Sequence, residues 1–171
     1  TNQREVAHRR EVAGLWSVQY DASWLTHPQA VALSPHLPLS AEPWMDGASQ
    51  RPVQWYFDNL LPEEGQRTLL AGDARLDAAD AFGLLAWYGA ESAGSLTLLS
   101  PEAAPQATEP LRPLPDEPLQ ARILQMPKAP LTHAAIKRMS LAGAQHKLAV
   151  VLQEGALFEP AGATPSTHIL K

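Results

Sequence analysis

The sequence contains no cysteine, which excludes disulfide bonds, thiol nucleophiles and zinc sites with cysteine ligands. It also lacks any apolar run approaching the ~18 residues that a membrane-spanning helix needs. Nor is there an excess of basic residues, since 13 Lys and Arg stand against 18 Asp and Glu and give a net charge of −5. A protein that grips a phosphate backbone by itself is usually basic. These absences favour a cytoplasmic protein with no membrane segment and no strong DNA contact of its own.

The composition is that of a folded chain with an interruption. Hydrophobic residues make up 45% of the 171 positions, which is enough to bury a core in one domain or two small ones. Six of the 16 prolines lie between Ser100 and Pro118, where bulky apolar residues are scarce. We therefore predict a semi-rigid, proline-rich linker at 101–118, with one folded region at 1–100 and another at 119–171.

The first fifty residues indicate β structure followed by irregular chain. Apolar and polar residues alternate at 15–20, which predicts a half-buried strand. A strand at 5–8 could pair with it through a turn at Arg9-Arg10. Asp21 or Ser23 is expected to cap a short helical turn. Five prolines between 26 and 52 predict that this stretch is irregular.

Helical patterns occupy the next forty residues. Pro52 suits the first turn of a helix whose apolar positions recur with helical spacing up to Leu60. A second helix is predicted from 63 to about 71. A third is expected to begin at Asp77, with Asp80 completing a capping box, and to end at Gly89. A strand is predicted at 95–99.

The last region changes to short strands. A short helix is expected at 119–126. An apolar run at 148–152 predicts a buried strand, a turn at 153–155 returns the chain into a second strand, and a third is expected at 167–171. The fold class predicted from these patterns is α+β.

A loop of small residues at 140–147 is the clearest candidate for chemistry. Backbone N–H groups of such a loop can surround phosphate oxygens, and Lys171 in the third strand could reach the same phosphates. The loop has only one glycine, Gly143. On the residues alone, an ordinary tight hairpin is therefore an open alternative to nucleotide binding.

Three separated motifs resemble those of one family. They are Ser140-Leu-Ala-Gly-Ala-Gln-His-Lys147 with Pro165-Ser-Thr-His-Ile-Leu-Lys171, Phe57-Asp-Asn-Leu-Leu-Pro62, and Phe82-Gly-Leu-Leu85 with Gly89. In this order and spacing the chain resembles the HipA family of bacterial serine/threonine protein kinases, the toxins of type II toxin–antitoxin modules that are linked to persistence. The likeness extends over nearly the whole chain.

The resemblance implies a small N-terminal β/α subdomain followed by the start of a kinase-like small lobe built from antiparallel strands. It also implies a transferase that uses ATP and Mg²⁺. By the same resemblance, Ser140 corresponds to the autophosphorylated serine of the family. The positions implied to contact ATP are Ala142, Gly143, Ala144, Gln145, Lys147 and Lys171.

The partners implied by the resemblance are a helix-turn-helix antitoxin of the HipB type and a protein substrate of the kinase. DNA contact is expected only indirectly, through the antitoxin. This division of labour agrees with the net charge of −5, which predicts little affinity of the chain itself for DNA.

The acidic groups that a protein kinase needs are missing from the sequence. A catalytic-loop Asp, an Asn and a metal-binding Asp should follow the strand lysine, but no Asp occurs after Asp116. We therefore interpret the chain as an N-terminal fragment that has no catalytic or metal-binding residue, is inactive alone and holds neither ATP nor Mg²⁺ by itself. The alternative is a non-catalytic module that docks on a HipA-like kinase core through Trp44 and the segment 57–62.

Other polar residues have plainer interpretations. The six histidines show neither His-x-x-x-His spacing nor companion carboxylates in sequence, which predicts no metal site. Asp58 and Asn59 suit hydrogen bonding at a helix end better than acid–base chemistry. Among the five tryptophans, Trp44 in its proline-rich loop is expected to be the most exposed.

Overall fold

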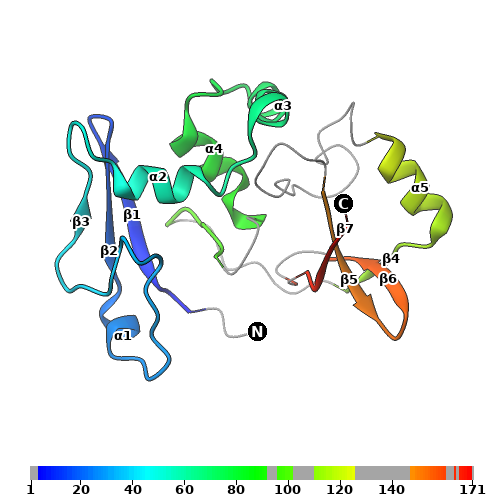
Figure 1. Cartoon of the computed structure of the whole chain (residues 1–171), viewed down its shortest axis with the longest axis horizontal. Coiled ribbons are helices and arrows are strands. Elements are labelled where there is room, and N and C mark those ends of the chain that lie inside the picture. The colour runs from blue at the N-terminus through cyan, green and yellow to red at the C-terminus, as the bar shows by residue number, and fades with distance from the viewer. Residues whose placement is uncertain are drawn as a thin grey trace. The chain divides into compact units, whose positions relative to one another are not determined.

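The computed structural model describes residues 4–91, 96–101, 110–125, 147–160, 164 and 166–170. The chain is α+β, as predicted, and consists of two compact units, Thr1–Asn59 and Leu60–Lys171 (Figure 1). Each unit contains helices and an antiparallel sheet. Within the described residues, no helix combines the length and the apolar character that crossing a membrane requires.

The first unit is built on a sheet with the strand order β1-β2-β3, formed by β1 (Ala7–Val12), β2 (Leu15–Tyr20) and β3 (Trp44–Met45). The predicted strand at 15–20 is confirmed. The turn expected at Arg9-Arg10 is wrong, because both arginines lie inside β1. The chain reverses instead at Ala13 and Gly14, which both have positive φ, as in the two-residue turns that match the twist of a hairpin.

The core of this unit is aromatic and encloses an arginine. Trp16, Val18 and Tyr20 alternate along β2 onto one buried face. The ring of Phe57 lies 6.5 Å from that of Trp16, and the guanidinium of Arg9 stacks 5.0 Å and 5.5 Å from the centroids of these two rings. Burial lowers the pKa of Arg9 to about 10, so the side chain remains charged at neutral pH.

The irregular stretch after β2 is held by side chains of β2 and of the short helix α1 (Ala22–Leu25). Asp21 caps α1, as expected, since its Oδ1 accepts the backbone N–H of Ser23 at 2.8 Å. The Tyr20 hydroxyl accepts the N–H of Leu33 at 2.8 Å and donates to the carbonyl of Leu37. These bonds tie the proline-rich loop to the sheet.

Helix α2 (Pro52–Asp58) begins at Pro52, as predicted, but its N-terminus is capped from a distance. The N-cap residue Arg51 makes no side-chain capping bond. Instead, the buried carboxylate of Asp46 accepts the N–H groups of Val53 at 2.9 Å and Gln54 at 3.0 Å. Asp46 follows β3 directly, and its own N–H donates to Trp16. The helix is thereby fixed to the sheet edge.

In the second unit, α3 (Glu64–Ala74) ends at Arg75, which is left-handed with φ 56°. Helix α4 (Ala81–Tyr88) buries the predicted apolar stripe of Ala81, Leu84, Leu85 and Tyr88. The expectation that Asp77 caps this helix is wrong. The cap is Asp80, whose Oδ1 accepts the N–H of Gly83 at 2.8 Å. A Cβ at Gly83 would meet that carboxylate, which explains the small residue in the motif.

Gly89 serves a purpose other than the expected left-handed helix end. Its φ is −65°, and the chain continues into the 3-10 turn η1 (Gly89–Glu91). The Leu98 N–H donates to the Gly89 carbonyl at 2.8 Å, and a Cβ at Gly89 would lie 2.6 Å from Leu98 Cβ. The glycine permits this close approach. Residues 96–99 form no strand, so that part of the strand prediction is wrong, and Ser95 lies outside the described residues.

The C-terminal sheet has the strand order β4-β6-β5-β7, with all pairs antiparallel. Its strands are β4 (Arg112–Pro113), β5 (Leu148–Gln153), β6 (Ala156–Glu159) and β7 (His168–Leu170). The three strands expected here are confirmed. Helix α5 (Asp116–Gln125) starts at Asp116 and not at 119, so that β4 and the start of α5 fall within the stretch expected to be a linker.

Candidate functional site

The candidate site is the end of the C-terminal sheet at which β5 begins and β7 ends (Figure 1). In the register of this antiparallel pair Leu148 lies opposite Leu170. Lys147, the last residue of the predicted phosphate loop, directly precedes β5, and Lys171 directly follows β7 in the sequence. The pairing therefore brings the end of the loop and the segment leading to the second lysine to one end of the sheet.

Most of the predicted site residues lie outside the part of the chain that the structure describes. They are Ser140, Ala142, Gly143, Ala144, Gln145 and Lys171. Lys147 is described and is half-buried at the start of β5. The roles assigned to these residues therefore stay predictions, whereas the sheet that flanks them is observed.

One face of this sheet is closed by an aliphatic cluster. Leu148 and Val150 are buried on it by strand alternation, and the cluster consists of Leu114, Leu119, Leu148, Val150, Leu157 and Leu170. Leu119 comes from α5, which is also joined to the sheet by an ion pair between Arg122 and Glu159. The side chains of that pair are 13% and 14% exposed, so they are shielded from most of the solvent. The helix thus braces the face opposite to the one that Ile169 occupies.

The other face combines small and apolar side chains near the lysine end. Ala149 pairs with Ile169 and therefore shares its face, while Val151 pairs with Phe158. Ile169 is 51% exposed. An apolar surface next to a cationic side chain suits a ligand with a flat apolar part and an anionic part.

Thr167 and His168 fix β7 to β5. The Thr167 N–H donates to Val150 at 3.0 Å, and its Oγ1 accepts the Leu152 N–H at 2.9 Å. The same hydroxyl lies 2.8 Å from Nδ1 of His168. A structural role for His168 had been expected, but the bridging hydroxyl of Thr167 carries no signal in the sequence.

The Phe57–Pro62 motif of the N-terminal region has structural roles where it is described. Phe57, Leu61 and Pro62 are buried. Asn59 is the C-cap of α2, and its N–H donates to Trp55 at 3.3 Å, consistent with the expected hydrogen bonding at a helix end.

The expectation for Trp44 is wrong. Its indole N–H donates to the Pro38 carbonyl at 2.9 Å, and the side chain is half-buried because the loop folds over it. Trp55 and Trp87, at 56% and 47% exposed, present far more surface to the solvent. Sequence reasoning placed the exposed indole in the proline-rich loop, whereas helices α2 and α4 carry the exposed ones.

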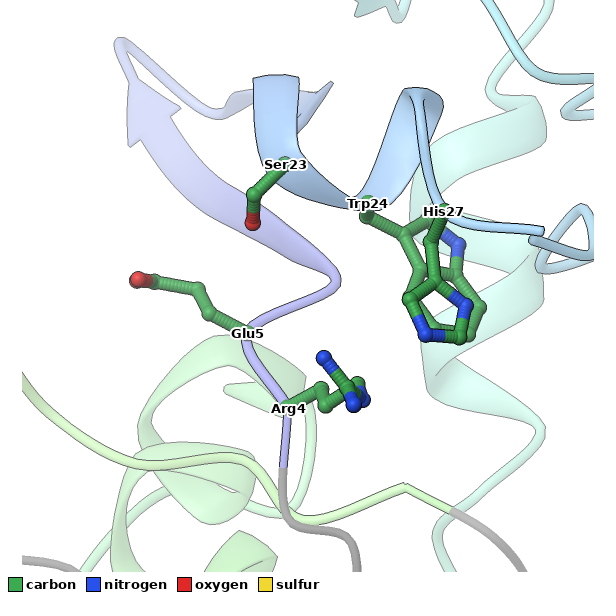
Figure 2. Close-up of a pocket in the computed structure, with 5 residues that line it drawn as sticks. All are labelled: Arg4, Glu5, Ser23, Trp24 and His27. Carbon is green, nitrogen blue, oxygen red and sulfur yellow. The ribbon is translucent and has the colours of Figure 1, made fainter. Parts of the chain in front are cut away.

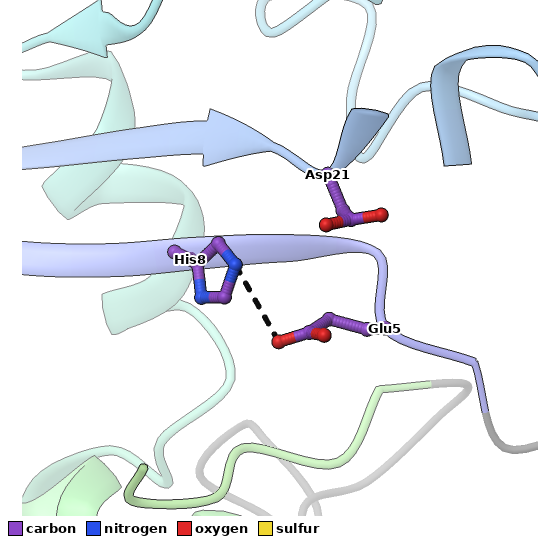
Figure 3. A group of neighbouring side chains, drawn as sticks. All are labelled: Glu5, His8 and Asp21. Atoms are coloured by element: carbon purple, nitrogen blue, oxygen red, sulfur yellow. Dashed lines mark ion pairs between the residues drawn. The ribbon is translucent and has the colours of Figure 1, made fainter. Parts of the chain in front are cut away.

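A second constellation lies in the first unit, where Glu5, His8 and Asp21 point toward one another (Figure 3). One ligand atom from each lies within 4.8 Å of the others, and His8 Nε2 is 3.4 Å from Glu5 Oε1. The histidine therefore does have companion carboxylates. Only Glu5 is near His8 in the sequence. The β1–β2 hairpin brings Asp21 beside it, and the Asp21 N–H donates to Val6 at 2.9 Å.

A shallow pocket of about 220 Å³ lies next to this constellation and shares Glu5 with it (Figure 2). Its lining consists of Arg4, Glu5, Ser23, Trp24 and His27. The rings of Trp24 and His27 stack at 5.5 Å with an angle of 8° between their planes. The Trp24 N–H is used internally, since it donates to Val31 at 3.1 Å.

The α+β fold with its two antiparallel sheets is the one that the resemblance to the HipA family implies. Residues 1–99 match the model of the HipA N-terminal domain, so the chain belongs to the HipA family.

Two similar proteins support this assignment. Over 158 residues the chain is 39% identical to "Putative kinase Y4mE" of Sinorhizobium fredii, covering 89% of this chain and 37% of that protein. It also matches a HipA chain of Shewanella oneidensis MR-1, solved as a complex of HipA, HipB and operator DNA, with a TM-score of 0.69 at 26% identity. That match covers 96% of this chain and 37% of the other. The chain thus spans a little over a third of the length of these relatives.

Proposed function

We propose that the chain is the N-terminal portion of a HipA-like serine/threonine protein kinase toxin and carries its phosphate-binding loop and ATP-contacting lysine. The observation that carries the proposal is the register of β5 against β7, which sets the end of the loop beside the segment leading to Lys171. In protein kinases a loop over the phosphates and a strand lysine bind the nucleotide, and the proposal assigns these roles to residues 140–147 and to Lys171.

The residues of this region fit the nucleotide better than they fit the metal. Lys147 and Lys171 would hold phosphate oxygens, the backbone N–H groups of Ala142 to Gln145 would surround them, and Ser140 would receive the phosphoryl group in autophosphorylation. The apolar face of Ala149 and Ile169 suits a base. Magnesium prefers carboxylate oxygens, and the sequence holds no Asp after Asp116. Of the two glutamates in this sheet, Glu159 pairs with Arg122, and Glu154 lies in the turn at the opposite end of β5 from Lys147. The ligands for Mg²⁺ are therefore assigned to no residue of this chain.

The test compares the chain with a chimera. Incubated with labelled ATP, the 171-residue chain is expected to transfer no phosphate. Joined to the remaining sequence of Y4mE, it should regain transfer. Lys171→Ala should abolish that transfer, whereas Lys128→Ala, at a lysine that is not among the proposed ATP contacts, should leave it unchanged. Transfer by the unextended chain, or full activity of the Lys171→Ala chimera, would overturn the proposal.

The partner assignment is part of the same proposal. A HipB-like helix-turn-helix antitoxin is expected to bind the protein and to supply the contact with DNA, supported by the HipA–HipB–operator complex of the Shewanella relative. A gel-shift titration should show no DNA binding by this chain alone, because its net charge is −5. A shift without antitoxin would contradict the assignment.

A second function, a non-catalytic module that docks on a HipA-like kinase core, is favoured by one observation. Trp55, two residues before the Phe57–Pro62 motif, is 56% exposed, and a large exposed indole is a frequent anchor of protein interfaces. Copurification of the chain with such a core, lost in Trp55→Ala, would support docking. Phosphoryl transfer by the chimera, with no binding of the free chain to a HipA-like kinase core, would support the kinase hypothesis instead.

A further inference from the structure

We propose that Glu5, His8 and Asp21 form a binding site for a divalent transition-metal ion of the zinc type on the first unit. The three side chains come from the chain before β1, from β1 and from the cap of α1, and they converge on one space (Figure 3). The site is separate from the nucleotide region proposed above and does not depend on it.

The donor set decides the class of ion. One imidazole nitrogen and two carboxylate oxygens suit Zn²⁺ and its neighbours in the transition series. Magnesium and calcium prefer sets made only of oxygen, and calcium needs six or more ligands. With three protein ligands, water would complete the tetrahedral shell of the zinc ion.

The three ligand atoms must come slightly closer together to bind a zinc ion. Ligand atoms around tetrahedral zinc lie roughly 3 Å apart, because each bond is about 2 Å long. The three atoms here lie within 4.8 Å of one another, and the imidazole and Glu5 already approach to 3.4 Å. The side chains of His8 and Glu5 are 50% and 63% exposed, so rotation about their side-chain bonds can close the set without moving the backbone.

Asp21 is the fixed member of the set. Its Oδ1 accepts the backbone N–H of Ser23 at 2.8 Å and also the Ser23 hydroxyl, and its main chain is bonded to Val6. Such outer bonds orient a metal ligand before the ion arrives.

A bound ion would join the segment before β1 to the cap of α1. Glu5 and Asp21 are 16 positions apart in the sequence, and the bond from the Asp21 N–H to Val6 already joins their segments, so the ion would add a second link. The expected consequence is stabilisation of the first unit that grows with the logarithm of the free zinc concentration once that concentration exceeds Kd.

The experiment uses the 171-residue chain, stripped of metal with a chelator, and titrates it with zinc chloride by calorimetry. One Zn²⁺ per chain is expected, with the ring signals of His8 shifting in NMR spectra. His8→Ala should weaken binding by tenfold or more. Asp21→Asn should do the same while preserving the cap of α1, because asparagine is an equally good N-cap residue.

The matched control is His36→Ala, since His36 is an exposed histidine elsewhere in the same unit. It should bind zinc as the parent chain does. Equal affinities of the parent and His8→Ala chains would overturn the proposal. So would magnesium binding as tight as that of zinc, since it would reveal an unselective cluster of charges. Circular dichroism of each variant without metal verifies that its fold is retained.

Discussion

The hairpins β1–β2 in the first unit and β5–β6 in the second have the same type of turn but pack against different kinds of side chain. Ala13-Gly14 and Glu154-Gly155 are both two-residue turns in which both residues have positive φ. The first hairpin packs Trp16 against a half-buried arginine and an aromatic helix residue. The second packs leucines and a valine.

This difference shows that one turn geometry serves two kinds of core. The turn sets the pairing register of each hairpin, and the side chains then decide what covers it. An aromatic and charged core requires partners with defined geometry, whereas an aliphatic core requires mainly volume. The first hairpin should therefore be more sensitive to single substitutions.

The largest effect is expected for Trp16→Ala. The substitution removes a buried ring that contacts Phe57 and Arg9, and should lower the free energy of unfolding by about 3–5 kcal/mol. Urea denaturation followed by far-UV circular dichroism measures it. Trp55→Ala, at an exposed position, is the control and should cost about 0.5 kcal/mol or less. Similar losses for the two variants would refute the claim that the aromatic core carries this unit.

The next effect tests the distant cap of α2 against the local cap of α4. Asp46→Ala leaves two backbone N–H groups without their buried acceptor and should cost about 1–3 kcal/mol. Asp80→Ala removes a local cap and should cost about 1 kcal/mol. The order of the two losses, measured by the same denaturation, is the prediction, and the reverse order would contradict it.

Gly14→Ala and Gly155→Ala test whether the two turns are equivalent. Nothing lies within 4 Å of a Cβ added at either glycine, so only the positive φ opposes the methyl group. Each substitution should cost about 1–2 kcal/mol, and the two values should agree. Thermal unfolding of both variants beside the parent chain provides the measurement, and a marked difference would show that a further contact distinguishes the turns.

The smallest effect concerns Tyr88. Its hydroxyl lies 2.8 Å from Asp73 Oδ2 and 3.1 Å from the Leu70 carbonyl, and burial first and then Asp73 raise its pKa. The native chain therefore keeps this proton above pH 10, where the unfolded chain loses it, and stability should fall as the pH rises beyond 10.

Tyr88→Phe should cost about 0.5–1.5 kcal/mol at neutral pH and remove part of that alkaline decline. Tyr20 and Tyr56, whose pKa values are also raised by burial, account for a further part in the first unit. Urea titrations of the parent and Tyr88→Phe chains at pH 8 and pH 11 separate the contribution of Tyr88 from that of Tyr20 and Tyr56. An unchanged decline in the variant would show that the Tyr88 phenol is not involved.

Local patterns in the sequence predicted the elements that depend on neighbouring residues. The alternation at 15–20, the apolar stripe of α4 and the cap at Asp21 are each confirmed. Missed features depend on distant residues. Asp46 caps a helix that begins six positions later. Gly89 must be small because Leu98 packs closely against it. No window of a few residues contains such a pair.

The same reasoning applies to the candidate sites. The strands β5 and β7 and their antiparallel sheet were predicted from short apolar runs, whereas the register that sets Leu148 opposite Leu170 comes from the structure. The set of Glu5, His8 and Asp21 could not be predicted, because it exists only once the hairpin has closed at Ala13-Gly14. With the turn expected at Arg9-Arg10, the sequence analysis did not bring Asp21 close to Glu5 and His8.

β7 lies at one end of the strand order of its sheet, and within the described strands it pairs only with β5. Among the described residues, no strand pairs with the outer side of these three residues, and Ile169 in their midst is 51% exposed. Such an edge accepts any extended peptide of suitable length, whether it follows along the same polypeptide or belongs to a neighbouring molecule. The tendency of the isolated chain to self-associate at high concentration should begin there.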